Sequence, residues 1–364
     1  MNKVKSTVIC VVFCALIGMF TFLHIILPDE EISASERRKK QQFPEISFSS
    51  LYSGEATKLL ESYMADQFPF REAFRRIKAT VNFYVFGQKD NDSVYCTDGY
   101  TGEYEGSIDH KSVDNFCKKI TSVYDRYLKD TDCKVYYSII PDKNRFLCQQ
   151  NGYPCYDYNE LFSSVDEKLS YMTKIEIESL LSAECYYKTD SHWRQEKILP
   201  VAEKICEGMG AEFTKAEKQS SLGEFYGVYY PRLALKLQPD ELITMENEAI
   251  SKSSVYIYDT DKTVSVYNKE KFKGNDPYEA FLSGSVGMLE ISNPTAASDK
   301  ELIIFRDSFS SSLAPLLLGD YSKITLVDIR YVTPAYMATK LSFENQDVLF
   351  IYSTMLVNNS ELLK

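Results

Sequence analysis

The chain has 364 residues, of which 44% are hydrophobic, 26% charged and 13% aromatic. It can bury at least one full core, and its composition excludes disordered, collagen-like and small disulfide-rich proteins. Its 41 Lys and Arg against 52 Asp and Glu give a formal net charge of −11, which argues against a protein that binds along a nucleic-acid backbone.

The N-terminal segment predicts a membrane anchor. Lys3 and Lys5 precede an uncharged stretch, residues 6–27, long enough to cross a hydrocarbon core of roughly 30 Å at about 1.5 Å per residue. Pro28-Asp29-Glu30-Glu31 follows without a good cleavage site, which favours an uncleaved anchor over a signal peptide. The two lysines favour a cytoplasmic N-terminus, although Arg37-Arg38-Lys39-Lys40 on the far side counts against this orientation.

These features divide the chain into three parts. Residues 1–27 are expected to form a cytoplasmic tip and a single transmembrane helix, residues 28–50 a polar stalk, and residues 51–364 an extracytoplasmic domain. The expected location is therefore the cell membrane, with the main domain outside the cytoplasm.

Helical and strand patterns alternate along the main domain. Apolar spacing predicts two helices over 53–84, joined at Phe68-Pro69-Phe70, and then a strand at 134–140. Further on, the predicted elements are helical segments at 158–181 and 194–209, a hairpin at 254–258 and 263–267, strands at 302–305, 323–327 and 348–352, and helices at 308–318 and 334–341. This alternation predicts an α/β domain with a parallel sheet covered by helices on both faces.

Seven of the nine cysteines lie outside the anchor, so they cannot all pair with one another. Cys148 and Cys155 flank a turn-rich loop that a disulfide would staple, and an exported location permits such a bond. Because no Cys or His spacing is typical of a zinc site, we expect no metal.

Ser308 is the candidate nucleophile. It follows the buried-type strand 302–305, at the carboxyl edge of the predicted sheet, where α/β folds bind ligands. The free N–H groups at the start of the next helix would face a developing oxyanion. The structural alternative is that Ser308 only caps that helix.

A serine nucleophile needs a base, and the chain has three histidines. His24 lies in the predicted span, and His110 lies in a polar stretch that resembles a surface loop. His192 is the remaining candidate, with Asp190 two residues earlier to orient its ring. The alternatives are a helix cap for Asp190 and a hydrogen-bonded, partly buried ring for His192.

Two motifs resemble a known family. Thr189-Asp190-Ser191-His192-Trp193 and Arg306-Asp307-Ser308-Phe309-Ser310 resemble the paired signature of the DHHW family and of related SGNH-like proteins that O-acetylate alginate and other exopolysaccharides. Further landmarks occur in the same order, namely Asp66-Gln67-Phe68-Pro69-Phe70-Arg71, Ile140-Pro141-Asp142-Lys143-Asn144, Phe225-Tyr226-Gly227 with Pro239-Asp240, and Val327-Asp328-Ile329-Arg330-Tyr331. The resemblance covers the chain from about residue 40 to its end.

The resemblance implies an SGNH-hydrolase-like fold and a role for each matching residue. Ser308 would be the nucleophile, His192 the general base and then acid, and Asp190 the residue that orients it, with no cofactor or metal. The Ser308 N–H, Gly284 and Asn144 would donate to the oxyanion. The candidates for substrate contacts are Trp193, Arg306, Arg330 and Tyr331.

The motifs depart from the family pattern at two positions. Ser191 stands where the family name records a histidine, but His192 matches the catalytic one. Arg306 stands where classical SGNH enzymes carry glycine, and its cation would either narrow the oxyanion site or bind an acidic group.

The function expected from this resemblance is that of a membrane-anchored extracytoplasmic O-acetyltransferase or acetylesterase acting on a cell-surface or secreted polysaccharide. Because acetyl-CoA is cytoplasmic, the resemblance also implies a membrane-bound O-acyltransferase as acetyl donor. The alternatives are a catalytically inactive polysaccharide-binding or assembly protein with the same fold, and a wall-associated structural protein.

Overall fold

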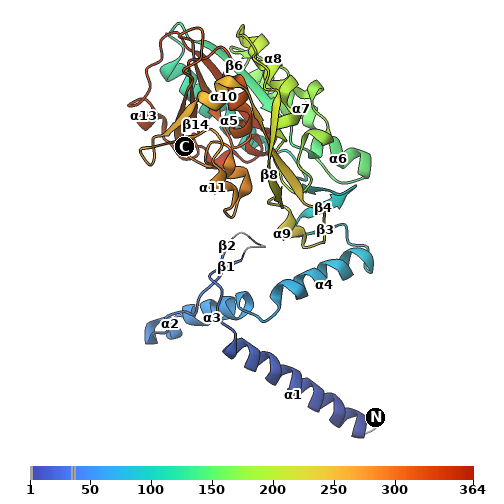
Figure 1. The fold of residues 1–364 in the computed structure, drawn as a ribbon. Helices are drawn as coiled ribbons and strands as arrows, with labels where there is room; N and C mark the ends of the chain where they lie inside the picture. The colour runs from blue at the N-terminus through green and yellow to red at the C-terminus, as the bar shows by residue number, and fades with distance from the viewer. Residues whose placement is uncertain (1–2, 34–35, 37) are drawn as a thin grey trace. The chain divides into compact units, whose positions relative to one another are not determined.

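The structure is a computed structural model that describes residues 3–33, 36 and 38–364 (Figure 1). Residues 1 and 2 of the predicted cytoplasmic tip, and Arg37 of the basic cluster, lie outside the described residues. The chain forms two compact units, Met1–Asp92 with Pro231–Lys236, and Ser93–Tyr230 with Leu237–Lys364. The predicted boundaries after residues 27 and 50 lie inside the first unit and stay predictions.

The first unit is mainly helical. Helix α1 (Lys3–Ile26) is the one helix among the described residues that is long and apolar enough to cross a membrane. Helices α3 (Glu55–Asp66) and α4 (Arg71–Tyr84) confirm the predicted pair. Pro69 and the left-handed Phe70, at φ 60°, separate them, since proline disfavours helical backbone in the residue before it. The unit also contains β1 (Ile32–Ser33), β2 (Arg38–Lys39), α2 (Phe48–Tyr52) and β3 (Asp90–Asn91).

An eight-stranded sheet forms the centre of the second unit, in the order β11-β10-β12-β14-β13-β15-β6-β7. The strands are β6 (Lys134–Ile140), β7 (Thr173–Lys174), β10 (Ser254–Ile257), β11 (Lys262–Ser265), β12 (Met288–Ser292), β13 (Glu301–Arg306), β14 (Lys323–Val327) and β15 (Asp347–Ser353). From β14 to β7 every pairing is parallel, whereas β12, β10 and β11 extend the sheet antiparallel. The sheet is mostly parallel, as predicted, and the predicted hairpin is its antiparallel edge.

Side chains of the central strand β13 alternate between two hydrophobic cores. Leu302 and Ile304 contact the core that includes α8 (Leu199–Met209), while Ile303 and Phe305 contact the core that includes α5 (His110–Tyr127) and α7 (Tyr158–Lys168). Because both faces are buried, the strand is apolar from Leu302 to Phe305 rather than alternating. This arrangement, with helices on both sides of the sheet (Figure 1), confirms the predicted α/β fold class.

Several predicted elements differ from the observed ones. His110 begins helix α5, capped by the Asp109 side chain, so the loop expected there is wrong. The helical pattern predicted to residue 181 ends at Lys168 and is followed by strand β7. The helix predicted for 308–318 is a short α12 (Ser310–Leu313) followed by a 3-10 turn, because Pro315 lacks the N–H that an α-helix requires.

Further helices and strands lie outside the central sheet, and most of α9 belongs to the first unit. They are β4 (Val94–Thr97), β5 (Tyr100–Glu103), α6 (Asn144–Asn151), β8 (Lys218–Phe225), α9 (Tyr230–Leu233), β9 (Asp240–Glu246), α10 (Glu248–Lys252), α11 (Lys269–Phe272), α13 (Pro334–Met337) and α14 (Thr354–Val357). Cys148 and Cys155 form a disulfide, the pairing that the turn-rich loop between them suggested.

Candidate active site

Ser308 lies at the carboxyl end of β13, in the turn between that strand and α12. The Asp307 carboxylate fixes this turn, since it accepts hydrogen bonds from the N–H groups of Phe309 (3.0 Å) and Ser353 (2.7 Å). Ser353 ends the neighbouring parallel strand β15. The turn is therefore tied to two strand ends, and the Ser308 side chain is half-buried there.

A tight loop presents Asp190 and His192. Tyr186 and Trp193 pair as an isolated β-bridge, and the N–H of Tyr187 donates to the carbonyl of His192 over 3.0 Å. Both site residues therefore lie between two paired chain segments. The fully buried Trp193 holds this loop to α12, because its indole N–H donates to the carbonyl of Phe309 over 2.9 Å.

The structure brings the three predicted side chains together. His192 Nε2 lies 2.8 Å from Ser308 Oγ, and His192 Nδ1 lies 2.6 Å from Asp190 Oδ1. A carboxylate only accepts hydrogen bonds, so Nδ1 carries the ring proton and Nε2 is the acceptor that faces the serine hydroxyl. This geometry suits proton transfer from Ser308 to His192.

Asp190 is fully buried and accepts three hydrogen bonds. Burial alone would raise the pKa of this carboxyl, but electrostatic attraction to His192, the hydrogen bonds from its ring and backbone N–H groups, and the N–H of Val228, 3.0 Å from Oδ2, hold its pKa well below the ordinary value. Gly227 is required beside it, since a Cβ at that position would lie 2.3 Å from the Asp190 Cα. Asp190 therefore remains a carboxylate at neutral pH.

Lys143 supports the loop that carries Asp190 and His192. Its fully buried ammonium donates to the carbonyls of Asp190 (2.7 Å), Tyr187 (3.0 Å) and Lys188 (3.2 Å). Burial lowers the pKa of Lys143 to about 8, although nearby carboxylates, of which Asp240 is the strongest, oppose this shift. Lys143 is thus a positioning residue for the Asp190 backbone.

Replacing Lys143 by methionine keeps the length of the side chain but leaves the three carbonyls without this donor. We expect the free energy of unfolding to fall by about 1–3 kcal/mol, the usual cost of unsatisfied buried polar groups. Urea unfolding followed by the fluorescence of Trp193, the only tryptophan, measures it. Lys188→Met, at an exposed position of the same loop, is the control and should change stability by less than about 0.5 kcal/mol.

Tyr278 lies flat against the imidazole. The rings of His192 and Tyr278 are stacked with centroids 3.7 Å apart and an interplanar angle of 8°, and the Tyr278 hydroxyl is 2.9 Å from Ser312 Oγ. The ring centroids of Phe309 and His192 are 5.0 Å apart. These contacts fix the plane of the ring, so that Nε2 points at Ser308.

Ser308 and His192 open into a pocket of about 350 Å³. Arg330 lies in its wall, and its guanidinium donates to both carboxylate oxygens of Asp328, at 2.9 and 2.6 Å. Burial would lower the pKa of Arg330, but Asp328 more than compensates and raises it. The other lining residues are Ser191, Asp307, Phe309, Ser353, Met355, Leu356, Asn359, Glu361 and Leu362.

The other sequence candidates lie outside the pocket lining. Asn144 is engaged in the core, since its Oδ1 accepts from Tyr95 and its Nδ2 donates to the Glu103 carbonyl, both at 2.7 Å. The N–H of Gly284 donates to the Phe281 carbonyl. Because these polar atoms have partners elsewhere, neither residue is included in the proposed site.

Arg306 and Tyr331 also lie beside the pocket rather than in its lining. The Arg306 guanidinium is fully buried and donates to Ser311 Oγ over 2.7 Å, and burial lowers its pKa. Its contacts fix the turn around Ser308. Tyr331 is half exposed and lies under the Arg330 guanidinium at 5.3 Å.

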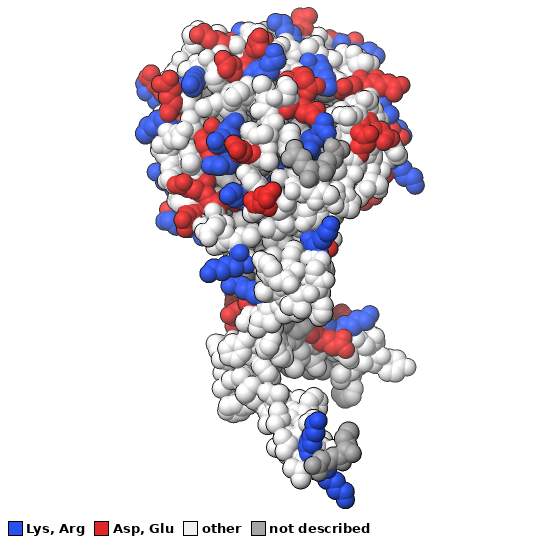
Figure 2. Space-filling view, turned by 90° about the vertical axis from the view of Figure 1, so that its right-hand side faces the viewer, with Lys and Arg blue, Asp and Glu red and all other residues white. Residues whose placement is uncertain are grey.

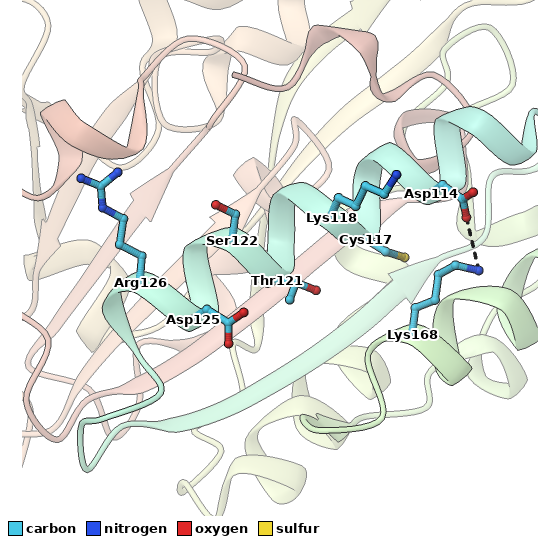
Figure 3. A pocket seen from close by; sticks show the side chains of 8 residues that line it. All are labelled: Asp114, Cys117, Lys118, Thr121, Ser122, Asp125, Arg126 and Lys168. Atoms are coloured by element: carbon cyan, nitrogen blue, oxygen red, sulfur yellow. Dashed lines mark ion pairs between the residues drawn. The ribbon is translucent and has the colours of Figure 1, made fainter.

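A second hollow lies along the outer face of α5, where Lys168 of α7 pairs with Asp114 at 3.3 Å (Figure 3). Burial raises the pKa of Cys117 in its wall to about 12, so this thiol is protonated at neutral pH. The hollow pairs no nucleophile with a base among the residues that line it, in contrast to the Ser308 pocket.

Comparisons with known proteins support the fold. No protein-family model and no curated protein matches the sequence. The fold is similar to that of a DHHW family protein from Eubacterium siraeum, with a TM-score of 0.59 and 18% identity over 74% of this chain and 94% of that one. It is also similar to Bacillus cereus PatB1, solved with a sulfonyl adduct, with a TM-score of 0.58 and 15% identity over 72% and 95% of the two chains.

A weaker likeness, with a TM-score of 0.44 and 10% identity, links 73% of this chain to 92% of the O-acetyltransferase domain of Pseudomonas putida AlgJ. The structure from Eubacterium siraeum confirms, at the level of the fold, the likeness to the DHHW family that the two motifs predict.

Sequence reasoning found the three central residues but missed those that hold them. Lys143, Gly227 and Asp240 all lie in motifs noted as family landmarks, and the structure gives each a role around Asp190. The Asp240 carboxylate accepts hydrogen bonds from the N–H groups of Lys188 and Thr189, each over 2.7 Å. No sequence signal pointed to Tyr278, which lies 30 residues before Ser308 in an unremarkable segment.

Proposed function

We propose that the chain is a membrane-anchored enzyme that transfers acetyl groups outside the cytoplasm to hydroxyl groups of a cell-surface or secreted polysaccharide, or to water. The observation that carries this proposal is the hydrogen-bonded series Ser308, His192 and Asp190, which opens into a pocket. A serine aligned with an imidazole and a buried carboxylate is suited to acyl transfer.

In the first half of the cycle, Ser308 Oγ attacks the acetyl carbonyl of the donor while His192 Nε2 takes the hydroxyl proton. The tetrahedral intermediate then collapses, and His192 returns the proton to the departing donor oxygen, which leaves an acetyl ester on Ser308. The Ser308 N–H is the proposed donor to the oxyanion. Asp190 stabilises the imidazolium that forms between these steps.

In the second half, an acceptor hydroxyl attacks the acetyl ester and gives its proton to His192. The Ser308 oxygen leaves and recovers that proton, so the enzyme returns to its starting state. A sugar hydroxyl as acceptor gives transfer, and water gives esterase activity. The open pocket, with Arg330, Asn359 and Glu361 in its wall, offers polar groups to a sugar.

The apolar helix α1 supports the anchoring part of the proposal. With the main domain outside the cytoplasm, acetyl groups must cross the membrane, and a membrane-bound O-acyltransferase is the proposed donor partner. PatB1, which has this fold, was solved with a sulfonyl adduct. Sulfonyl groups attach to nucleophilic side chains, so the same type of reagent suits a test here.

The test is covalent labelling of the full-length protein by a sulfonyl-fluoride probe, with the modified residue identified by mass spectrometry. We expect stoichiometric modification of Ser308 and none in Ser308→Ala. Ser310→Ala is the matched control and should label normally, since its buried hydroxyl has no hydrogen-bond partner in the described part of the chain. A native protein that resists the probe while it binds polysaccharide would instead be a binding protein.

A further inference from the structure

Helix α4 of the first unit exposes an apolar stripe. Phe74, Ile77 and Tyr84 lie at helical spacing on one face, and Phe70, also exposed, directly precedes the helix. Their exposed fractions lie between 44% and 79%. A stripe of large apolar side chains at this spacing normally faces a core, yet these side chains stay largely exposed, and the ring contacts of the stripe are those of Phe74 with Phe20 and Phe68.

The rest of α4 is basic. The helix carries Arg71, Arg75, Arg76 and Lys78 against the single acidic residue Glu72. Arg71 and Arg75 pair with Glu36 at 2.7 and 3.3 Å, whereas Arg76 and Lys78 are exposed. Lys78, four residues after Phe74, borders the stripe, and Arg76 lies farther around the helix. A helix whose face of aromatic and aliphatic side chains is flanked by Arg and Lys is typical of helices that lie in the plane of a membrane interface.

Contacts with α1 indicate which surface covers the stripe. Phe20 of α1 stacks on Phe68 at 5.3 Å and meets the edge of Phe74 at 5.8 Å. Phe20 precedes the end of α1 by six residues, about 9 Å along the helix axis. Interfacial helices bury their apolar face by about 5–10 Å, so a crossing α1 holds Phe74 at the depth expected for such a helix.

We infer that α4 lies in the interface between membrane and water on the extracytoplasmic side. Its apolar stripe lies against the acyl chains, and Arg76 and Lys78 lie at anionic headgroups. This inference rests on the anchoring part of the proposed function. The bilayer is the proposed partner of the stripe because the stripe is continuous with the apolar surface of α1. Figure 2 shows that this surface is uncharged beyond the lysines at the start of α1.

The consequence concerns the second unit. Residues 85–92 lead from the end of α4 to Ser93, the first residue of that unit, and the chain from Tyr84 to Ser93 spans about 30 Å when fully extended. A membrane-bound α4 therefore keeps the start of the catalytic unit within about 30 Å of the surface. A membrane-bound acetyl donor would deliver its acetyl groups within the same distance of the membrane surface.

The test uses full-length protein in vesicles of phosphatidylcholine and phosphatidylglycerol with brominated acyl chains, which quench nearby tryptophan. Three single substitutions are compared: Ile77→Trp on the stripe, Arg76→Trp one residue earlier and roughly 100° around the helix, and Ile17→Trp within α1. The native Trp193 is fully buried in the second unit and gives a constant background.

We expect the tryptophans at 77 and 17 to be quenched alike, at least roughly twofold more than the tryptophan at 76. Quenching at 17 but not at 77 would show that protein covers the stripe, which overturns the inference and leaves the anchor intact. Quenching at neither position overturns the anchor as well. Labelling of Ser308 by the sulfonyl-fluoride probe is independent of all three results, so the acyl-transfer proposal is judged separately.

Discussion

His192→Ala is expected to lower kcat for release of acetate from an activated acetyl ester by about 10⁴- to 10⁶-fold. The imidazole is the only base within hydrogen-bond distance of Ser308 Oγ among the described residues. Without it, the serine hydroxyl must lose its proton to water, and the departing oxygen receives none. The measurement is the steady-state rate of the purified full-length variant against the native protein.

His110→Ala provides the matched control, because His110 is the other histidine outside α1 and its side chain is 68% exposed on α5. It should retain the full rate. Added imidazole should restore part of the activity of His192→Ala, since loss of the ring leaves a space beside Tyr278 and Phe309. A fully active His192→Ala variant would remove this residue from the mechanism, and a rate that imidazole cannot raise would point to a structural role.

The architecture of the second unit was predictable because burial on both faces leaves a simple mark in the sequence. Strands such as 302–305 and 348–352 are unbroken apolar runs, and helical patterns lie between them. Strand β12 was missed, and it separates the parallel strands from the hairpin. Its position depends on pairing with residues far away in the chain, which no local pattern specifies.

Helix α5 shows a different kind of omission. Its apolar residues Val113, Phe116, Ile120 and Val123 follow a helical repeat, and Asp109 is a typical capping residue. The signal was therefore present in the sequence, but the polar residues around His110 suggested a loop. Polar composition at a helix start reflects the cap and the exposed first turn rather than the absence of structure.

The candidate site was predictable to the extent that few residues were eligible. Three histidines, of which one lies in an apolar span, leave His192 beside Asp190, and the strand end singles out Ser308. Lys143 and Tyr278 act through three-dimensional contacts alone, with three backbone carbonyls and with one ring face. The first of these contacts joins segments 47 residues apart in the chain, so spacing carries no information about it.

Asp190→Asn is expected to reduce kcat by about 10⁴-fold with little change in the size of the side chain. The Asp190 carboxylate accepts from His192 Nδ1 and from the N–H of Val228. An amide offers one acceptor, so either Val228 faces an N–H or the imidazole changes tautomer and turns a donor toward Ser308. The same acetate-release assay measures this loss, and the rate of the variant should stay low at every pH at which the native protein releases acetate.

The same substitution has a distinct effect on stability. The pKa of Asp190 lies well below its ordinary value of 3.8 in the folded state, so this group stabilises the fold above that pH and loses its contribution as the pH falls below it. The amide of the variant cannot titrate. The difference in free energy of unfolding between the native protein and Asp190→Asn should therefore be largest near neutral pH and shrink as the pH falls below 3.8, as read from urea unfolding through Trp193 fluorescence. A difference that stays constant across this range would mean that Asp190 is not the buried carboxylate that holds the imidazole.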